Sequence, residues 1–132
     1  MTALAAAIRA FLAAPPFAVV GASNDPAKFG ALVLAAYRRA GLRAYPVNPR
    51  EREVQGLPCH PDLASLPEPV LNVSIITPPT VTERIVEEAA RAGVRCVWMQ
   101  PGAESAAAVA RARALGLEVI SGGPCVLVEL RG

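Results

Sequence analysis

Short apolar runs alternate along this chain with longer segments in which apolar residues recur at helical spacing. The run at 17–20 is rich in β-branched side chains, as is typical of a central strand covered on both faces. The same reading predicts strands at 17–20, 43–47, 71–77, 94–100 and 117–120, and helices at 1–14, 27–40, 80–92 and 103–115. The first of these helices is amphipathic, with Thr2 as its cap, and Pro15-Pro16 ends it.

A glycine followed by an apolar residue ends three of the predicted helices, at Gly41, Gly93 and Gly116. This pattern is typical of a left-handed C-cap with its hydrophobic contact. Each glycine precedes a predicted strand, so the chain repeats βα units. We therefore expect an α/β, Rossmann-like, doubly wound and mostly parallel sheet of five or six strands. Helices should cover both of its faces, within a single domain over residues 1–132.

Weaker patterns occupy three other segments. Residues 54–57 predict at most a very short strand, and the proline-rich residues 58–69 predict at most one helical turn around Leu63 and Leu66. Residues 126–130 are apolar and predict either a final strand or an extended tail. Thr80 and Glu83 have the spacing of a capping box and are expected to open the helix that runs to residue 92.

The turn after the first strand carries the candidate chemistry. Gly21 permits a sharp exit from the strand, Asn24 or Asp25 is predicted to cap the next helix, and Pro26 suits its first position. A helix that begins just past a strand points backbone N–H groups and its positive dipole end above the sheet. We therefore expect an anion site, most often one for phosphate; the alternative is an ordinary turn without a ligand.

Lys28 lies in this same turn and is the only lysine among the thirteen basic residues. A chain that otherwise uses arginine can keep a lysine where a compact ammonium suits the site better than a planar guanidinium. Chance is the alternative explanation.

Composition excludes several functional classes. The net charge of +2 is no footprint of a general nucleic-acid binder, and 5% aromatic residues are too few for stacking of single-stranded bases. No apolar run approaches the roughly 18–20 residues of a membrane span. Three cysteines without CxxC spacing and one histidine predict neither a disulfide framework nor a metal site, and a reducing cytoplasm is the expected location.

The carboxyl ends of the predicted strands share a composition of small residues, prolines and hydrogen-bonding side chains. Ligands of doubly wound sheets bind at these ends. No paired carboxylates and no Ser, His and Asp set occur there, which indicates a ligand cradle rather than a reaction centre. The four ends are Gly21-Ala22-Ser23, Asn48-Pro49-Arg50, Thr77-Pro78-Pro79 and Met99-Gln100-Pro101-Gly102.

The first βα turn departs from the dinucleotide fingerprint. Ser23 and Pro26 occupy the second and third glycine positions, and Asn48 stands where an acid would bind the ribose of NAD. Arg50 would instead attract a phosphate. Plain NAD is therefore disfavoured, while NADP and coenzyme A remain. Coenzyme A offers a pyrophosphate for the helix N-terminus and a 3′-phosphate for Arg50.

Four motifs, in this order and spacing, carry a resemblance to a known family. Over about residues 14–130 the chain resembles the small stand-alone CoA-binding proteins. These are similar to the N-terminal CoA-binding domain of the succinyl-CoA synthetase alpha subunit and of the ADP-forming acyl-CoA synthetases. The motifs are Val20-Gly21-Ala22-Ser23 through Lys28, Tyr45-Pro46-Val47-Asn48-Pro49-Arg50, Val97-Trp98-Met99-Gln100-Pro101-Gly102 and Gly116-Leu117-Glu118-Val119.

The resemblance implies a site for coenzyme A or an acyl-CoA. The phosphates would lie on the loop that contains Gly21, Ala22, Ser23, Asn24 and Lys28. The adenosine and its 3′-phosphate would lie by Asn48, Pro49 and Arg50. Thr77, Pro78, Pro79, Gln100, Pro101 and Gly102 would line the rest of the crevice.

The synthetases also carry a second domain with a histidine that is phosphorylated during turnover. The one histidine here, His60, falls in the proline-rich connection, so the resemblance supports non-catalytic binding and gives no support for ligase catalysis. Two alternatives remain open. One is an NADP-binding, oxidoreductase-like domain. The other is a small enzyme with Cys125 as its nucleophile, although a buried packing cysteine is the plainer interpretation of that residue.

Overall fold

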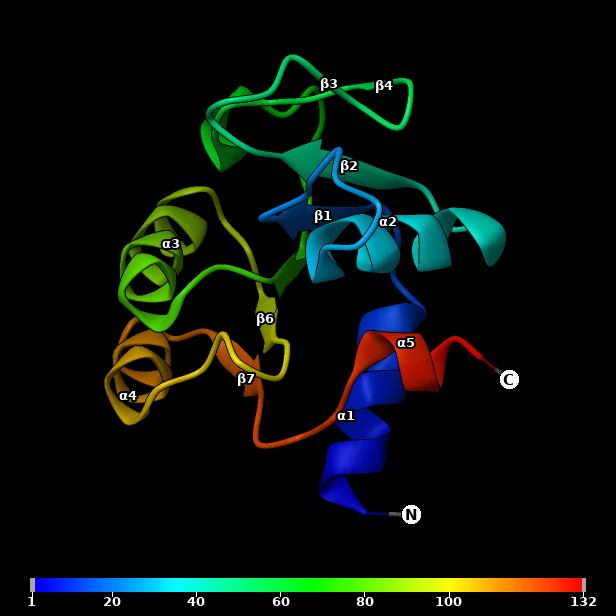
Figure 1. The fold of residues 1–132 in the computed structure, drawn as a ribbon. Coiled ribbons are helices and arrows are strands. Elements are labelled where there is room, and N and C mark those ends of the chain that lie inside the picture. The colour runs from blue at the N-terminus through cyan, green and yellow to red at the C-terminus, as the bar shows by residue number, and fades with distance from the viewer. Residues whose placement is uncertain (1, 132) are drawn as a thin grey trace.

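A five-stranded parallel sheet forms the centre of the protein, as seen in a computed structural model that describes residues 2–131 (Figure 1). The strand order is β2-β1-β5-β6-β7, and every pair of neighbours in it is parallel. A separate antiparallel hairpin follows β2 in the sequence. The strands are β1 (Phe17–Val20), β2 (Ala44–Val47), β3 (Glu53–Val54), β4 (Leu57–Pro58), β5 (Asn72–Ile75), β6 (Cys96–Met99) and β7 (Glu118–Ile120).

Helices cover both faces of the sheet, which confirms the predicted Rossmann-like class and the N-terminal helix. In Figure 1, α3 and α4 lie together on one side of the sheet, and α1, α2 and α5 lie on the other. The helices are α1 (Ala3–Leu12), α2 (Phe29–Arg39), α3 (Pro79–Arg91), α4 (Ala106–Ala114) and α5 (Val126–Glu129), with a 3₁₀ turn, η1 (Leu63–Ser65). Residue 1 of the predicted first helix lies outside the described residues.

Strand β1 shows why the central run is apolar without alternation. Ala18 and Val20 point into the core beneath α3 and α4, whereas Phe17 and Val19 point into the core beneath α1 and α2. All four side chains are buried. Both faces of this strand are therefore covered, as expected for the middle of a doubly wound sheet.

The predicted glycine caps are confirmed at all three positions. Gly41, Gly93 and Gly116 have φ of +74°, +79° and +87°, in the left-handed region. After the first of them, the Leu42 amide donates to the Tyr37 carbonyl at 3.0 Å, and the other two caps repeat this bond. Each helix thus returns to the sheet through the same turn, which explains the repeated βα order.

Three predicted helix starts are wrong. Helix α2 begins at Phe29 with Lys28 as its N-cap, because Asp25 accepts a hydrogen bond from the Ala27 amide and closes a turn before the helix. Helix α3 begins at Pro79, so Thr80 lies inside the helix and forms no capping box. Helix α4 begins at Ala106, three residues later than predicted, with Ser105 as its cap.

Two short segments also differ from the prediction. Residues 126–130 form neither a strand nor an extended tail, because Val126–Glu129 is a helix that buries Val126 on the α1 and α2 face. Four apolar residues suit a strand or a helical turn equally well, so local pattern does not decide between them. Residues 54–57 contribute to two strands of the β3–β4 hairpin, which turns at Gln55 and Gly56.

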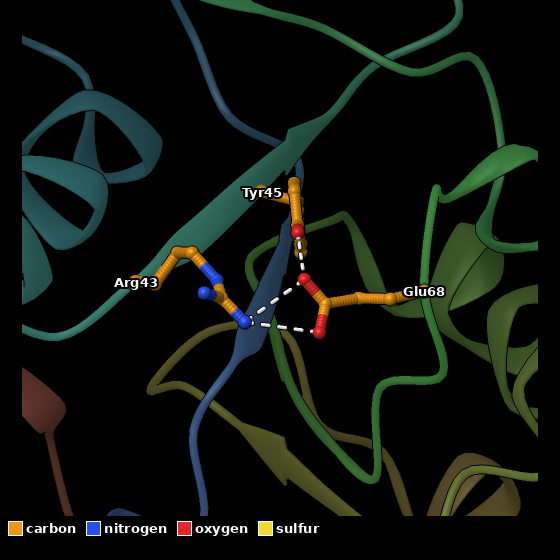
Figure 2. Close-up of polar contacts among 3 residues, drawn as sticks. All are labelled: Arg43, Tyr45 and Glu68. Atoms are coloured by element: carbon orange, nitrogen blue, oxygen red, sulfur yellow. Dashed lines mark hydrogen bonds and ion pairs between the residues drawn. The ribbon is translucent and has the colours of Figure 1, made fainter.

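A polar cluster fastens the proline-rich segment to the edge of the sheet (Figure 2). Arg43 Nη2 donates to both carboxylate oxygens of Glu68, at 2.9 Å each, and the Tyr45 hydroxyl donates to the same carboxylate. Tyr45 lies on the edge strand β2 and Glu68 lies just before β5. The hydrogen bond to Glu68, followed by partial desolvation, raises the pKa of Tyr45.

We predict that Glu68→Gln lowers the pKa of Tyr45 toward its ordinary value of about 10, because the neutral phenol loses a charged acceptor. The pKa of Tyr45 is higher in the folded protein than in the unfolded chain. The hydrogen bond from Tyr45 to Glu68 therefore stabilises the fold below about pH 10, and this stabilisation is lost as pH rises through the folded-state pKa of Tyr45. Absorbance at 295 nm during alkaline titration measures it. Burial raises the pKa of Tyr37, which shifts its ionisation to more alkaline pH. Glu129→Gln, on an exposed face of α5, is the control; identical titrations of the wild type and Glu68→Gln would contradict the prediction.

Candidate functional site

The candidate site lies at the carboxyl edge of the sheet, where β1, β2, β5 and β6 all end because they are parallel. The chain order reverses direction between β1 and β5, so the helices that follow these two strands lie on opposite faces. This is the switch point at which open α/β sheets bind ligands. The loop at 21–28 follows β1, and residues 76–78 follow β5.

Two glycines bring helix α2 into direct contact with the turn after β1. Gly21 has φ of +97°, and a Cβ there would lie 3.0 Å from the Ile76 carbonyl oxygen. A Cβ on Gly30 would lie only 1.9 Å from the Gly21 carbonyl oxygen. Gly30 therefore performs the close-packing role of the last glycine in a nucleotide fingerprint. Pro26, which the motif spacing predicts at that position, does not fill this role; Gly30 does, and its signal is its place in the first turn of the helix.

The first turn of α2 points unpaired donors toward the space above the switch point. The amides of Phe29 and Gly30 have no acceptor within the helix, as at any helix start, whereas that of Ala31 donates back to the Lys28 carbonyl at 3.1 Å. Lys28 is the N-cap residue and its side chain is exposed. An ammonium and the positive end of a helix dipole thus lie together beside β1.

Asn48 joins the end of β2 to this loop. Its Nδ2 donates to the Ala22 carbonyl at 2.8 Å, and its Oδ1 accepts from the Arg50 amide at 2.9 Å. Both polar groups of the side chain are therefore used within the protein. Asn48 holds the two strand ends in register, and the exposed Pro49 and Arg50 extend beyond it.

Asn24 is turned toward the β3–β4 hairpin. Its Nδ2 donates to Glu51 Oε2 at 3.0 Å and to the Glu53 carbonyl at 2.7 Å. The hairpin is also fastened to α2, because Gln55 Nε2 donates to the Ala31 carbonyl at 2.8 Å. In the same loop, the Ser23 hydroxyl accepts a hydrogen bond from the Asp25 amide at 3.0 Å.

The turn after β5 is held by two threonines. The hydroxyls of Thr77 and Thr82 lie 2.8 Å apart, and Thr82 Oγ1 lies 3.2 Å from the Pro78 carbonyl oxygen. Thr77 and Pro79 are half-buried and Pro78 is exposed. These contacts fasten the turn to the start of α3, and Pro78 is exposed at the carboxyl edge of the sheet.

Gln100 is completely buried at the end of β6, on the face covered by α1, α2 and α5. Its Oε1 accepts from the Val126 amide at 2.9 Å, while its Nε2 has no partner among residues 2–131. The exposed Pro101 and Gly102 follow. Glu104, which sequence reasoning missed, accepts the Gly102 amide at 3.1 Å and fixes this turn.

Burial disfavours the thiolate form of two of the three cysteines. Burial raises the pKa of Cys96 to about 12 and raises the pKa of Cys59 less strongly. Cys125 is half-buried at the start of α5. Among residues 2–131 no group of three or more His, Cys, Asp or Glu side chains is arranged to hold a metal ion. Within the same residues no helix is long and apolar enough to cross a membrane.

Comparison with known protein families matches residues 16–131 to the CoA binding domain. The chain belongs to this CoA-binding-domain family. The match includes all five parallel strands and the loops at their carboxyl ends.

Individual relatives agree with the family match. The domain is 36% identical over 77 residues to acetate–CoA ligase (ADP-forming) I of Archaeoglobus fulgidus, covering 58% of this chain and 11% of that ligase. A protein from Pyrococcus horikoshii has a TM-score of 0.88 and 30% identity, covering 94% of this chain and 87% of its own. Dinucleotide-forming acetyl-coenzyme A synthetase 1 of Candidatus Korarchaeum cryptofilum has a TM-score of 0.74 and 29% identity, covering 86% and 26%. This CoA-binding domain thus spans a small part of the curated ligases that it matches.

We predict that Gly30→Ala destabilises the CoA-binding domain by about 3 kcal/mol, the upper end of the usual cost of overpacking, because the new methyl group would meet backbone. Urea unfolding measures the loss. Gly41→Ala is the matched control: its Cβ would meet nothing within 4 Å, so only the left-handed backbone costs about 1–2 kcal/mol. Equal losses in the two variants would show that the contact between Gly30 and Gly21 is not tight.

Proposed function

We propose that this chain binds coenzyme A or an acyl-CoA through the loop at 21–28 and does not itself transform the ligand. The observation that carries the proposal is the approach of Gly30 to the Gly21 carbonyl, which seats the start of α2 directly above the β1–β5 switch point. Donors at that place suit a pyrophosphate, which coenzyme A contains. Membership of the CoA-binding-domain family supports the same ligand.

In this proposal the free amides of Phe29 and Gly30 bind the pyrophosphate, and the Lys28 ammonium adds a positive charge beside them. Arg50, just past the end of β2, receives the 3′-phosphate of the ribose. Both side chains are exposed and free to reach a ligand in the solvent above the sheet. The Asn48 side chain does not contact the ligand in this proposal. Its hydrogen bonds to the Ala22 carbonyl and from the Arg50 amide place Arg50 relative to the loop.

The pantetheine arm then extends across the ends of β5 and β6. Pro78 and Pro101 are exposed and offer apolar surface there. Gln100 is completely buried, and its Oε1 accepts from the Val126 amide, so in this proposal it shapes the end of β6 and does not contact the arm.

Binding without catalysis is supported by the composition of the strand ends at 21–23, 48–50, 77–79 and 99–102, which contain no paired carboxylates and no Ser, His and Asp set. A carrier, a sensor or a binding subunit is the corresponding biological role.

We predict that Lys28→Ala weakens coenzyme A binding about tenfold, as expected when one charge-assisted contact to a phosphate is lost. Isothermal titration calorimetry with coenzyme A measures the dissociation constant. Arg84→Ala removes one positive charge from the exposed surface of α3 and serves as the control. The proposed site is wrong if the two variants bind equally well, and the proposed ligand is wrong if the wild type does not bind coenzyme A.

Arg50→Ala tests the adenosine end of the same site. We expect about tenfold weaker binding of coenzyme A but less than about twofold weaker binding of dephospho-CoA, because only the former carries the 3′-phosphate. Thermal shift with each ligand gives an independent reading, since a ligand that binds the folded state raises its melting temperature. Equal effects on the two ligands would show that Arg50 does not bind the 3′-phosphate. Titration with NADPH in parallel separates this proposal from an NADP site.

A further inference from the structure

Glu51 places a negative charge against the loop that should receive a phosphate. Its Oε2 accepts a hydrogen bond from Asn24 Nδ2 at 3.0 Å. Asn24 lies within the loop at 21–28, four residues before Lys28. A carboxylate is thus held by a residue of the predicted phosphate loop itself.

The donors of Asn24 are fully used in this arrangement. A carboxamide nitrogen carries two hydrogens, and here one is directed to Glu51 and the other to the Glu53 carbonyl at 2.7 Å. Asn24 is therefore available to a ligand phosphate only when it leaves the hairpin. In the free protein, the carboxylate of Glu51 accepts a hydrogen bond that Asn24 could otherwise donate to a phosphate.

The hairpin that carries Glu51 is not loose. Gln55 Nε2 donates to the Ala31 carbonyl at 2.8 Å, and Arg38 Nη1 donates to the Gln55 carbonyl at 2.8 Å. Gln55 also has φ of +53°, as the first position of a two-residue hairpin turn requires. Two bonds to α2 thus keep the hairpin, and the carboxylate at its start, beside the loop.

The charges around the loop are balanced rather than uniformly positive. Lys28 and Arg50 attract a phosphate, whereas Asp25 and Glu51 repel it. Asp25 uses one carboxylate oxygen to accept the Ala27 amide at 3.0 Å and so stabilises the loop. Glu51 closes no such turn. Its carboxylate is held by Asn24, so its effect on an arriving anion is repulsive.

We propose that Glu51 is an autoinhibitory residue of the phosphate site: held by Asn24, its carboxylate opposes the binding of an anionic ligand and lowers the affinity of the loop. The proposal rests on the proposed function, and it concerns how strongly that site binds rather than whether it does. In the free protein the Glu51 carboxylate occupies one of the two donors of Asn24. A bound ligand has to compete with it.

The test is Glu51→Gln, which removes the charge and keeps an oxygen that accepts from Asn24. Isothermal titration calorimetry with coenzyme A at about 20 mM salt should show about fivefold tighter binding than the wild type. At about 0.5 M salt the difference should fall below about twofold, because exposed charges are then screened within a few ångströms. Comparable melting temperatures establish that the variant is folded.

Glu53→Gln is the matched control, since it removes the same charge from the same hairpin. Glu53 contacts Asn24 only through its backbone carbonyl, so its affinity should stay within about twofold of the wild type. A gain equal to that of Glu51→Gln would mean that the total charge of the hairpin matters and not the position of Glu51. That outcome overturns the proposal.

A double-mutant cycle with Asn24→Ala tests the role of the hydrogen bond. Without Asn24 the carboxylate is no longer held against the loop, so adding Glu51→Gln should then change affinity by less than about twofold. A full fivefold gain in that background contradicts a carboxylate positioned by Asn24.

The remaining outcomes separate this proposal from the proposed function. If the wild type binds coenzyme A and Glu51→Gln binds it equally or less well, the autoinhibitory role is wrong and the coenzyme A site stands. If neither the wild type nor any variant binds coenzyme A at either salt concentration, both proposals are wrong.

Discussion

The close packing of the first turn of α2 on the turn after β1 is the constraint on which the candidate site depends. It requires a glycine on each side: Gly21 for the backbone turn and the nearby Ile76 carbonyl, and Gly30 for the space that any side chain would fill. The result places helix amides above the sheet at the point where its connections reverse. In the proposed site, backbone geometry places the amides that would bind an anion, and side chains only add to them.

Several polar side chains at the strand ends form hydrogen bonds within the protein. Asn48 joins β2 to the loop after β1, and Thr82 holds the turn after β5. Asn24 is fastened to the hairpin that carries Glu51. A site assembled from loops needs such internal bonds, because each loop pays conformational entropy unless something orders it. In the proposed site, the exposed Lys28 and Arg50 are the side chains that would contact an anion.

The end of β6 is hydrogen-bonded to the C-terminal part of the chain. Trp98 Nε1 donates to the Pro124 carbonyl at 3.0 Å, and Gln100 Oε1 accepts from the Val126 amide at 2.9 Å. Both side chains are completely buried. The short helix α5 is therefore docked by residues at and just after the end of β6, so its place is decided by tertiary contacts rather than by helix propensity.

The sequence by itself determined the parallel α/β class, the strand positions and the three glycine C-caps. Those features follow from local periodicity and from the conformations that glycine alone adopts readily. Only the tertiary structure decided that α5 is a helix, that Gln100 is buried, that Asn24 faces Glu51 and that Gly30 meets Gly21. Each of these depends on a contact between segments that are separated along the chain, and no local pattern encodes the identity of such a partner.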